Sequence, residues 1–337
     1  MMCEAETPIV LSVVIPCYNE EEVLPETVKQ LCGLLESMVS ESLIHPDSHL
    51  CLVDDGSKDK TWPIIQDLSA TSSQVRGLKL ARNRGHQNAL LAGLENAEGD
   101  VLVSIDADLQ DDITVIRTMV EQYYVGNEIV YGVRKKRTTD SFFKRFTAEG
   151  YYYLLSKMGV NIVFNHADYR LMSRRAIEAL RRYEEVNLFL RGIIPTIGFS
   201  TTEVYYDRAE RFAGESKYPL KKMLALALDG ITSFSAVPLR FIAGLGLIIF
   251  IFSMLISVWA LGIRLFTDEA IPGWASSVLP MYLLGGIQIL SLGVIGEYVS
   301  KVYMETKRRP RYLIERAVGE QTGTKSNIQK AKSQTVA

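Results

Sequence analysis

The sequence predicts an α/β protein in which a doubly wound, mostly parallel sheet is followed by amphipathic juxtamembrane helices and two transmembrane helices. Short apolar runs alternate with amphipathic stretches up to about residue 135, several of these runs are followed directly by polar motifs, and two long uncharged runs lie near the carboxyl terminus. We therefore expect four parts: a domain at 1–215, interfacial helices at 216–238, a membrane hairpin at 239–300 and a basic, then polar tail at 301–337.

The strands expected in the first domain are short apolar runs separated by segments of helical character. They are IVLSVVIP from Ile9, HLCLVDD from His49, VRGLKLA from Val75, GDVLVSID from Gly99 and NEIVYGV from Asn127. Such alternation is typical of βαβ units, whose strands pair in parallel. The less regular segment from Arg134 to Asp207 contains an aromatic and basic helix and a further strand, STTEVYYD, and we expect it to cover the ends of the sheet.

The apolar content of the chain is concentrated near its carboxyl end. Hydrophobic residues make up 47% of the sequence and the mean hydropathy is +0.08, which is slightly high for a soluble protein. Residues 241–263 and 270–296 carry no charge. As a helix rising about 1.5 Å per residue, each run can cross a hydrocarbon core roughly 30 Å thick. Buried helices of a soluble core are the alternative, but such helices rarely stay uncharged for so long.

The basic residues beside the two runs predict their orientation. Arg240 precedes the first run and a basic cluster between Lys301 and Arg311 follows the second, whereas the loop between them sets one arginine against two acidic residues. We therefore expect a multi-pass protein of the cytoplasmic (inner) membrane, with both termini and the first domain in the cytoplasm. No signal peptide is expected, and the net charge of -2 does not favour a nucleic-acid partner.

Three polar motifs follow expected strands: PCYNEEE from Pro16, DDGSKDKT from Asp54 and DADLQDD from Asp106. The carboxyl ends of parallel strands meet at one edge of a sheet, so the three motifs should form one ligand-binding crevice. Two of them also have a local explanation. Asn19 can cap a helix with Glu22 three residues later, and DDGSKDKT makes a good turn and helix cap.

The local explanation leaves three side chains suited to bind a nucleoside. Glu20 stands at a strand terminus, where its carboxylate can accept hydrogen bonds from a ribose. Tyr18 can stack on a base, and Asp55 can accept the imide N–H of uracil. These residue types point to a nucleotide at the crevice.

The third motif crowds four carboxylates, Asp106, Asp108, Asp111 and Asp112, behind the apolar run VLVSI. Like charges this close raise one another's energy unless a cation lies among them. Divalent cations such as Mg²⁺ or Mn²⁺ take oxygen ligands and keep positions open for phosphate oxygens. A solvated acidic turn is the alternative. Taken with the other two motifs, the acidic run predicts a nucleotide diphosphate bound through a metal ion.

In this order, the PxYNE, VDDGS, RNRGHQNALLAG and DADLQD segments resemble the family 2 glycosyltransferases with a GT-A fold. The later ADYRLMSRR and RFAGESKY segments and the two uncharged runs resemble the polyprenyl-phosphate branch of that family, which includes bactoprenol glucosyltransferases and dolichol-phosphate mannose synthase. The resemblance runs from about Leu11 to Arg311.

The resemblance implies a metal-dependent, inverting transfer of a hexose from a nucleotide sugar to undecaprenyl or another polyprenyl phosphate, for glycosylation of the cell envelope. Glucose from UDP-glucose is the first expectation. Mannose, galactose, an N-acetylated hexosamine or aminoarabinose stay open, because one sequence does not show which hydroxyl groups the pocket contacts.

The resemblance also implies roles for individual residues. Nucleotide-sugar binding is expected of Pro16, Tyr18, Glu20, Asp55, Asp106, Ala107, Arg211 and Ser216. Metal binding is expected of Asp106, Asp108 and Gln110, and binding of the acceptor phosphate of Arg134 and Arg145. Catalytic roles are expected of Asp108, Asp168, Arg170 and Lys217. Asp168 is the one candidate base, and its alternative role is to orient Arg170 or a sugar hydroxyl.

Two other classes of protein share parts of this pattern. A processive polysaccharide synthase resembles a chain with more spans and a QxxRW element, which this sequence lacks. A membrane-anchored protein that binds nucleotide sugar or sugar lipid without turnover is the alternative of a different class, although the intact acidic motif favours an enzyme. Glycines in the uncharged runs permit close helix approach, so a homo-oligomer, dimer or tetramer, is a further expectation.

Overall fold

The structure is a computed structural model that describes residues 8–134, 166–186, 190–207 and 274–319, together with single helical residues between 239 and 255. The chain divides into two compact units, one made of 1–152, 161–217 and 309–337 and the other of 153–160 and 218–308. The expected interfacial helices at 216–238 lie outside the described residues, and the four-part division remains a prediction.

Eight strands of the first unit form one sheet among the described residues, in the order β7-β5-β6-β4-β1-β2-β3-β8. They are β1 Leu11–Cys17, β2 His49–Asp54, β3 Val75–Leu80, β4 Val101–Ser104, β5 Ile129–Arg134, β6 His166–Ser173, β7 Thr201–Tyr206 and β8 Ile314–Val318. Strands β4, β1, β2 and β3 pair in parallel, as do β5 and β7, whereas β6 and β8 run antiparallel to their neighbours. The predicted mostly parallel α/β sheet is confirmed, but β6 and β8 were not predicted.

The central strands are buried because helices cover both faces of the sheet. The helices of this unit include α1 Leu24–Ser40, α2 Thr61–Thr71, α3 His86–Asn96, α4 Val115–Tyr124, α6 Arg174–Leu180 and α7 Leu190–Thr196. Side chains alternate between the two faces of a strand. In β1, Val13 joins the core formed with α1 and α4, while Val14 faces α3. A Cβ at Gly93 of α3 would lie 2.2 Å from Cγ1 of Val14, so only glycine permits this close packing.

The three polar motifs follow β1, β2 and β4, which are neighbours in the sheet, as the sequence predicted. The helix-capping interpretation of Asn19 is wrong. Helix α1 begins at Leu24 without a side-chain cap, and Oδ1 of Asn19 accepts a hydrogen bond from the backbone N–H of Lys58 at 2.9 Å. The predicted turn after β2 is present, since the Asp54 carboxylate accepts the N–H of Ser57 at 3.0 Å. The first two motifs therefore bind each other across the strand ends.

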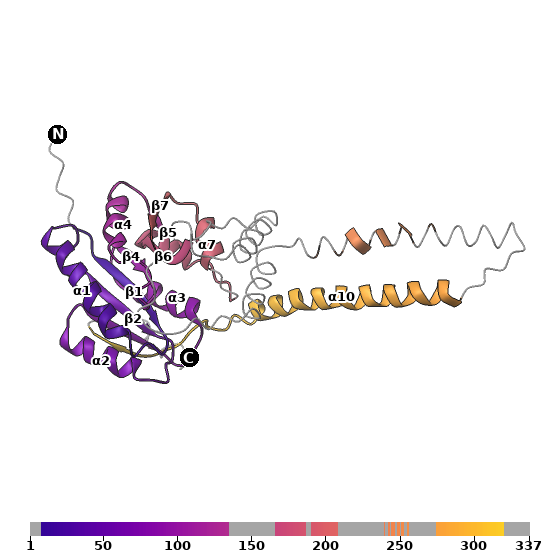
Figure 1. Cartoon of the computed structure of the whole chain (residues 1–337), viewed down its shortest axis with the longest axis horizontal. Helices are drawn as coiled ribbons and strands as arrows, with labels where there is room; N and C mark the ends of the chain where they lie inside the picture. The colour runs from indigo at the N-terminus through magenta and orange to yellow at the C-terminus, as the bar shows by residue number, and fades with distance from the viewer. Residues whose placement is uncertain are drawn as a thin grey trace, which may run out of the picture. The chain divides into compact units, whose positions relative to one another are not determined.

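The carboxyl-terminal part of the first unit adds the edge strand β8 beside β3, visible as the yellow strand along the sheet in Figure 1. Just before β8, the Tyr312 hydroxyl donates a hydrogen bond to the Glu95 carboxylate and accepts one from Asn96 at 2.9 Å. Burial, with the neighbouring Glu95 charge, raises the pKa of Tyr312. These contacts attach residues 309–319 to the carboxyl end of α3.

In the second unit, helix α10 spans Trp274–Thr306. Within the described part of the chain, no helix meets the length and apolarity needed to cross a membrane. The two transmembrane helices remain a prediction.

Replacing Tyr312 by Phe should lower the free energy of unfolding by roughly 1–2 kcal/mol, because it removes a hydrogen bond to a charged group and leaves Asn96 without that acceptor. Thermal unfolding of the purified chain measures the change, with Tyr303→Phe as the control, because Tyr303 is 58% exposed. Equal melting temperatures for the two variants would show that this attachment contributes nothing to stability.

Candidate functional site

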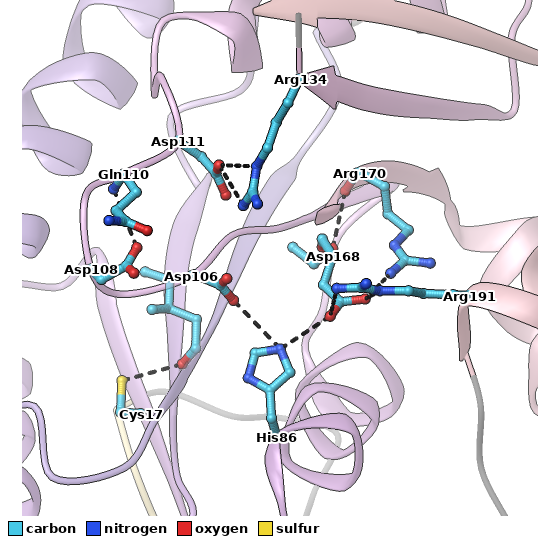
Figure 2. A network of polar contacts seen from close by, with 12 residues as sticks. Cys17, His86, Asp106, Asp108, Gln110, Asp111, Arg134, Asp168, Arg170 and Arg191 are labelled. Carbon is cyan, nitrogen blue, oxygen red and sulfur yellow. Dashed lines mark hydrogen bonds and ion pairs between the residues drawn. The ribbon is translucent and has the colours of Figure 1, made fainter. Parts of the chain in front are cut away.

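The acidic run after β4 is divided between separate partners. Oδ1 of Asp106 lies 3.4 Å from Nε2 of His86, at the start of α3 (Figure 2). Asp111 pairs with Arg134, and Asp112 accepts hydrogen bonds from the backbone and hydroxyl of Thr114 at 2.9 and 2.7 Å. The crowding of Asp111 and Asp112 is therefore compensated by side chains and backbone of the protein itself, without a metal ion. Asp106 and Asp108 remain the carboxylates for which metal binding was predicted.

Arg134, at the end of β5, has a side chain that is only 17% exposed and is paired with Asp111. Its Nη2 and Nε lie 3.0 and 3.2 Å from Oδ1 of Asp111, and the Tyr206 hydroxyl donates to the same oxygen at 2.6 Å. Burial alone would lower the pKa of Arg134, but Asp111 and Tyr206 raise it above its usual value. The predicted contact of Arg134 with the acceptor phosphate stays a prediction, because in this structure Asp111 balances its charge.

Two arginines and a histidine surround Asp168 on β6 (Figure 2). Nη2 of Arg170 lies 2.5 Å from Oδ1, and Arg191 of α7 donates from Nε to Oδ1 at 3.2 Å and from Nη2 to Oδ2 at 3.1 Å. Nε2 of His86 lies 3.5 Å from Oδ2. Arg191 was not among the predicted site residues. The signal that pointed to it is an arginine within an apolar segment, where a cation requires a partner.

Burial and neighbouring charges shift the pKa values of His86, Asp106 and Asp168. Burial would raise the pKa of Asp168, but the His86 hydrogen bond and the Arg191 and Arg170 charges hold it well below its usual value. The pKa of Asp106 is raised, mainly by burial and also by the neighbouring carboxylates. The contact with His86 acts in the opposite direction but does not cancel these effects. Burial lowers the pKa of His86, but Asp168 and Asp106 outweigh this and raise it. Asp168 is thus a stable anion and a weak base.

The turn that carries Asp108 and Gln110 has an unusual backbone. Leu109 has a φ of 54°, a left-handed conformation that costs a residue other than glycine about 1–3 kcal/mol. The N–H of Gln110 donates to Oδ1 of Asp108 at 3.2 Å. Among the described residues, no group of three or more His, Cys, Asp or Glu side chains is arranged to hold a metal ion. The predicted metal ligands therefore stay a prediction.

The residues predicted to bind the nucleoside lie around the ends of β1 and β2. Tyr18 is 41% exposed, and Glu20 lines a cavity of about 410 Å³ together with Asn19, Glu21, Glu22, Val23, Lys58 and Asp59. Pro16 lies within β1. Ala107 is buried, and its carbonyl oxygen accepts a hydrogen bond from the Thr27 hydroxyl at 2.7 Å. Tyr18 does not line this cavity, so the predicted stacking of its ring on a base stays a prediction.

Asp55 holds the loop that leads into α3. Its two carboxylate oxygens accept the backbone N–H groups of Arg84 at 2.7 Å and Gly85 at 2.9 Å. The neighbouring Gly56 has a φ of 67°, and a Cβ there would lie 2.7 Å from the backbone nitrogen of Asn83. The turn after β2 therefore fixes the backbone directly before His86. Recognition of a base by Asp55 stays a prediction.

The structure brings Asp106 and Asp168 together around His86 and pairs Arg170 with Asp168, and it places Arg134 in a separate ion pair. Four other predicted site residues lie outside the described residues: Arg145, Arg211, Ser216 and Lys217. The described residues thus form an acidic turn, a carboxylate contacted by two arginines and His86, and a separate cavity lined by the loop after β1 together with Lys58 and Asp59.

Comparison with known proteins identifies the family. Residues 12–181 match the model of glycosyl transferase family 2. An uncharacterized glycosyltransferase of Bacillus subtilis is 53% identical over 91% of this chain and 91% of its own, and the bactoprenol glucosyl transferase of Shigella phage SfX is 40% identical over 90% of this chain and 98% of its own. A solved Mycobacterium tuberculosis glucosyl-3-phosphoglycerate synthase, in complex with Mn²⁺ and UDP-glucose, has a TM-score of 0.44 and 20% identity, over 66% of this chain and 78% of its own. The chain belongs to glycosyl transferase family 2.

Proposed function

We propose that the protein transfers a hexose from a nucleotide sugar to a polyprenyl phosphate, with glucose from UDP-glucose as the first candidate donor. One observation carries this proposal. Proteins named bactoprenol glucosyl transferase from Shigella phages SfX and SfV are 40% identical to this chain over 90% of its length, and the match covers 98% and 97% of their own. Bactoprenol is a polyprenol, so its phosphate is the acceptor class that these names indicate.

The reaction releases a nucleoside diphosphate, whose negative charge rises as the sugar departs. Asp106 and Asp108, with Gln110, would hold Mg²⁺ or Mn²⁺, which neutralises that charge when bound. The acidic turn fits a cation, because burial and the neighbouring carboxylates raise the pKa of Asp106, and a cation relieves both effects. The cavity at Glu20 would take the nucleoside part of the donor.

Asp168 acts in this proposal as an orienting anion. The acceptor is a phosphate monoester, which is largely ionised near neutral pH because its second pKa is about 6, so the attack requires no strong base. Asp168 is a weak base in any case, since His86, Arg191 and Arg170 hold its pKa low against the effect of burial. Direct attack on the anomeric carbon inverts its configuration, so an α-linked donor gives a β-linked product, without a covalent enzyme intermediate. Positioning of donor and acceptor then supplies most of the rate.

We further propose that residues 239–300 form a membrane hairpin with both chain ends and the site in the cytoplasm. The acceptor lipid stays in the bilayer, so the enzyme must reach the headgroups. Supporting this, helix α10 exposes apolar side chains such as Met281, Ile289 and Leu292 in an uncharged stretch. A large exposed apolar surface indicates contact with a membrane or a partner. The basic residues after α10 are suited to anionic headgroups.

Asp108→Ala should lower hexose transfer by at least about 10²-fold, because the leaving diphosphate loses several kcal/mol of charge stabilisation. The assay follows radiolabelled glucose from UDP-glucose into extracted undecaprenyl phosphate. Asp67→Ala is the matched control, since Asp67 is exposed on α2 away from the strand ends. Unchanged transfer by the Asp108 variant would contradict the proposed metal site.

Removing divalent cations with EDTA should stop transfer by the wild-type protein, and Mg²⁺ or Mn²⁺ added in excess should restore it. The reason is that two neighbouring carboxylates and a diphosphate repel one another without a cation. Activity that persists in EDTA would exclude an exchangeable metal ion as part of the reaction.

A panel of UDP-glucose, UDP-galactose, UDP-N-acetylglucosamine and GDP-mannose should give the highest transfer rate with UDP-glucose, and the product should carry a β-linked sugar by NMR. An α-linked product would refute direct inversion. If no nucleotide sugar gives a lipid-linked product although the protein binds the nucleotide, the chain is a binding protein rather than an enzyme.

A further inference from the structure

The orientation of the Asp168 carboxylate depends on contacts from separate elements. Asp168 and Arg170 are two residues apart on β6 and so point to the same face of the strand. Arg170 is fully buried, and it contacts Asp168 through one nitrogen, at 2.5 Å from Oδ1. Its Nε and Nη1 have no hydrogen-bond partner among the described residues. The Arg170 contact by itself restrains one oxygen of the carboxylate and does not hold Oδ2.

Arg191 is the residue that fixes the plane of the carboxylate. Its Nε and Nη2 donate to the two different oxygens of Asp168, at 3.2 and 3.1 Å. A guanidinium that binds both oxygens of a carboxylate in parallel restrains rotation as well as position. Oδ2 is thereby directed at Nε2 of His86, 3.5 Å away, and the same nitrogen lies 3.4 Å from Asp106.

Helix α7 is itself held against the helix that begins with His86. The N–H of Leu190 donates to Oε1 of Gln87 at 3.0 Å, and Gln87 follows His86 directly in α3. Leu190, Ile193 and Ile194 are buried. The backbone of Arg191 is therefore held in place by the packing of α7 and by its hydrogen bond to α3.

We propose that Arg191 is a positioning residue of the transferase, which acts by orienting Asp168 toward His86 and the acidic turn of Asp106. Arg191 touches neither leaving group nor nucleophile in this role, and it acts on the reaction through the Asp168 carboxylate. The proposal rests on the proposed hexose transfer, because it assigns Arg191 a part in that reaction.

Steady-state kinetics of full-length Arg191→Ala and Arg191→Lys, with UDP-glucose and undecaprenyl phosphate, test the proposal. We expect kcat of the alanine variant to fall about 10²-fold, the cost of a misplaced catalytic group, with the donor KM within about threefold. Lysine should recover only part of the rate, since its ammonium cannot bind both oxygens as a planar fork does. The control is Arg175→Ala, which removes an arginine that is 71% exposed and pairs with Glu128 outside the site.

A double-mutant cycle with Asp168→Asn separates positioning from direct contact with substrate. If Arg191 acts through Asp168, the double variant Arg191→Ala with Asp168→Asn is no slower than Asp168→Asn alone. Multiplication of the two losses would overturn the proposal, as would a kcat of Arg191→Ala equal to that of wild type. Millimolar guanidinium should restore part of the rate of Arg191→Ala. If guanidinium does not restore the rate and the melting temperature of the variant is far below that of the wild type, Arg191 has only a structural role and the proposal is wrong.

A crystal structure of Arg191→Ala provides a readout that does not need turnover. We expect the Asp168 carboxylate to turn away from His86, whereas an unchanged carboxylate would overturn the inference. Absence of transfer by the wild-type protein with every nucleotide sugar would instead refute the proposed function, so the two failures are distinguishable. If the alanine variant does not fold, the same structure is solved for Arg191→Lys, where one carboxylate oxygen of Asp168 should lose its contact with residue 191.

Discussion

Compensation of buried charge at the carboxyl ends of the strands is the constraint on which the site depends. A buried carboxylate costs several kcal/mol unless it is paired and hydrogen-bonded. Asp168 is 11% exposed and Asp111 is 2% exposed, and each is paired with arginine. The insertion of β6 between β4 and β5 makes this possible, because it places Arg170 opposite Ser104, directly before the acidic turn.

Helix α3 is the element that joins the separate parts of the catalytic unit. Its first turn follows the loop held by Asp55, and Gly93 allows it to pack on β1 and β2 without a gap. Its carboxyl end is attached to Tyr312, which lies beyond helix α10 in the sequence. A short helix restrained at both ends and along its length cannot shift its first residue independently. The position of His86 between Asp106 and Asp168 is therefore a property of the whole unit.

The features that depend on residues close together in the sequence were predicted correctly. The strands β1 to β5 and β7 and the convergence of three motifs follow from apolar periodicity and from the rule for parallel sheets. The prediction for Asn19 failed because a capping pattern is local, whereas its partner, Lys58, comes from the next strand end. An arginine within an apolar segment indicates that Arg191 needs a partner, but neither that partner nor β8 was predictable in this way, since the contacting residues are distant in sequence and no spacing rule connects them.

The charged side chains of the site separate into an acidic side and a basic side. Asp106 and Asp108 alone would repel a bound anion such as a phosphate group. On the other side of His86, Arg170 and Arg191 carry two positive charges against the single negative charge of Asp168. That excess offsets the repulsion over the few ångströms at which charges interact strongly in a partly buried site. The site thus has an acidic side fit for a cation and a basic side fit for an anion, and His86 lies where the two meet.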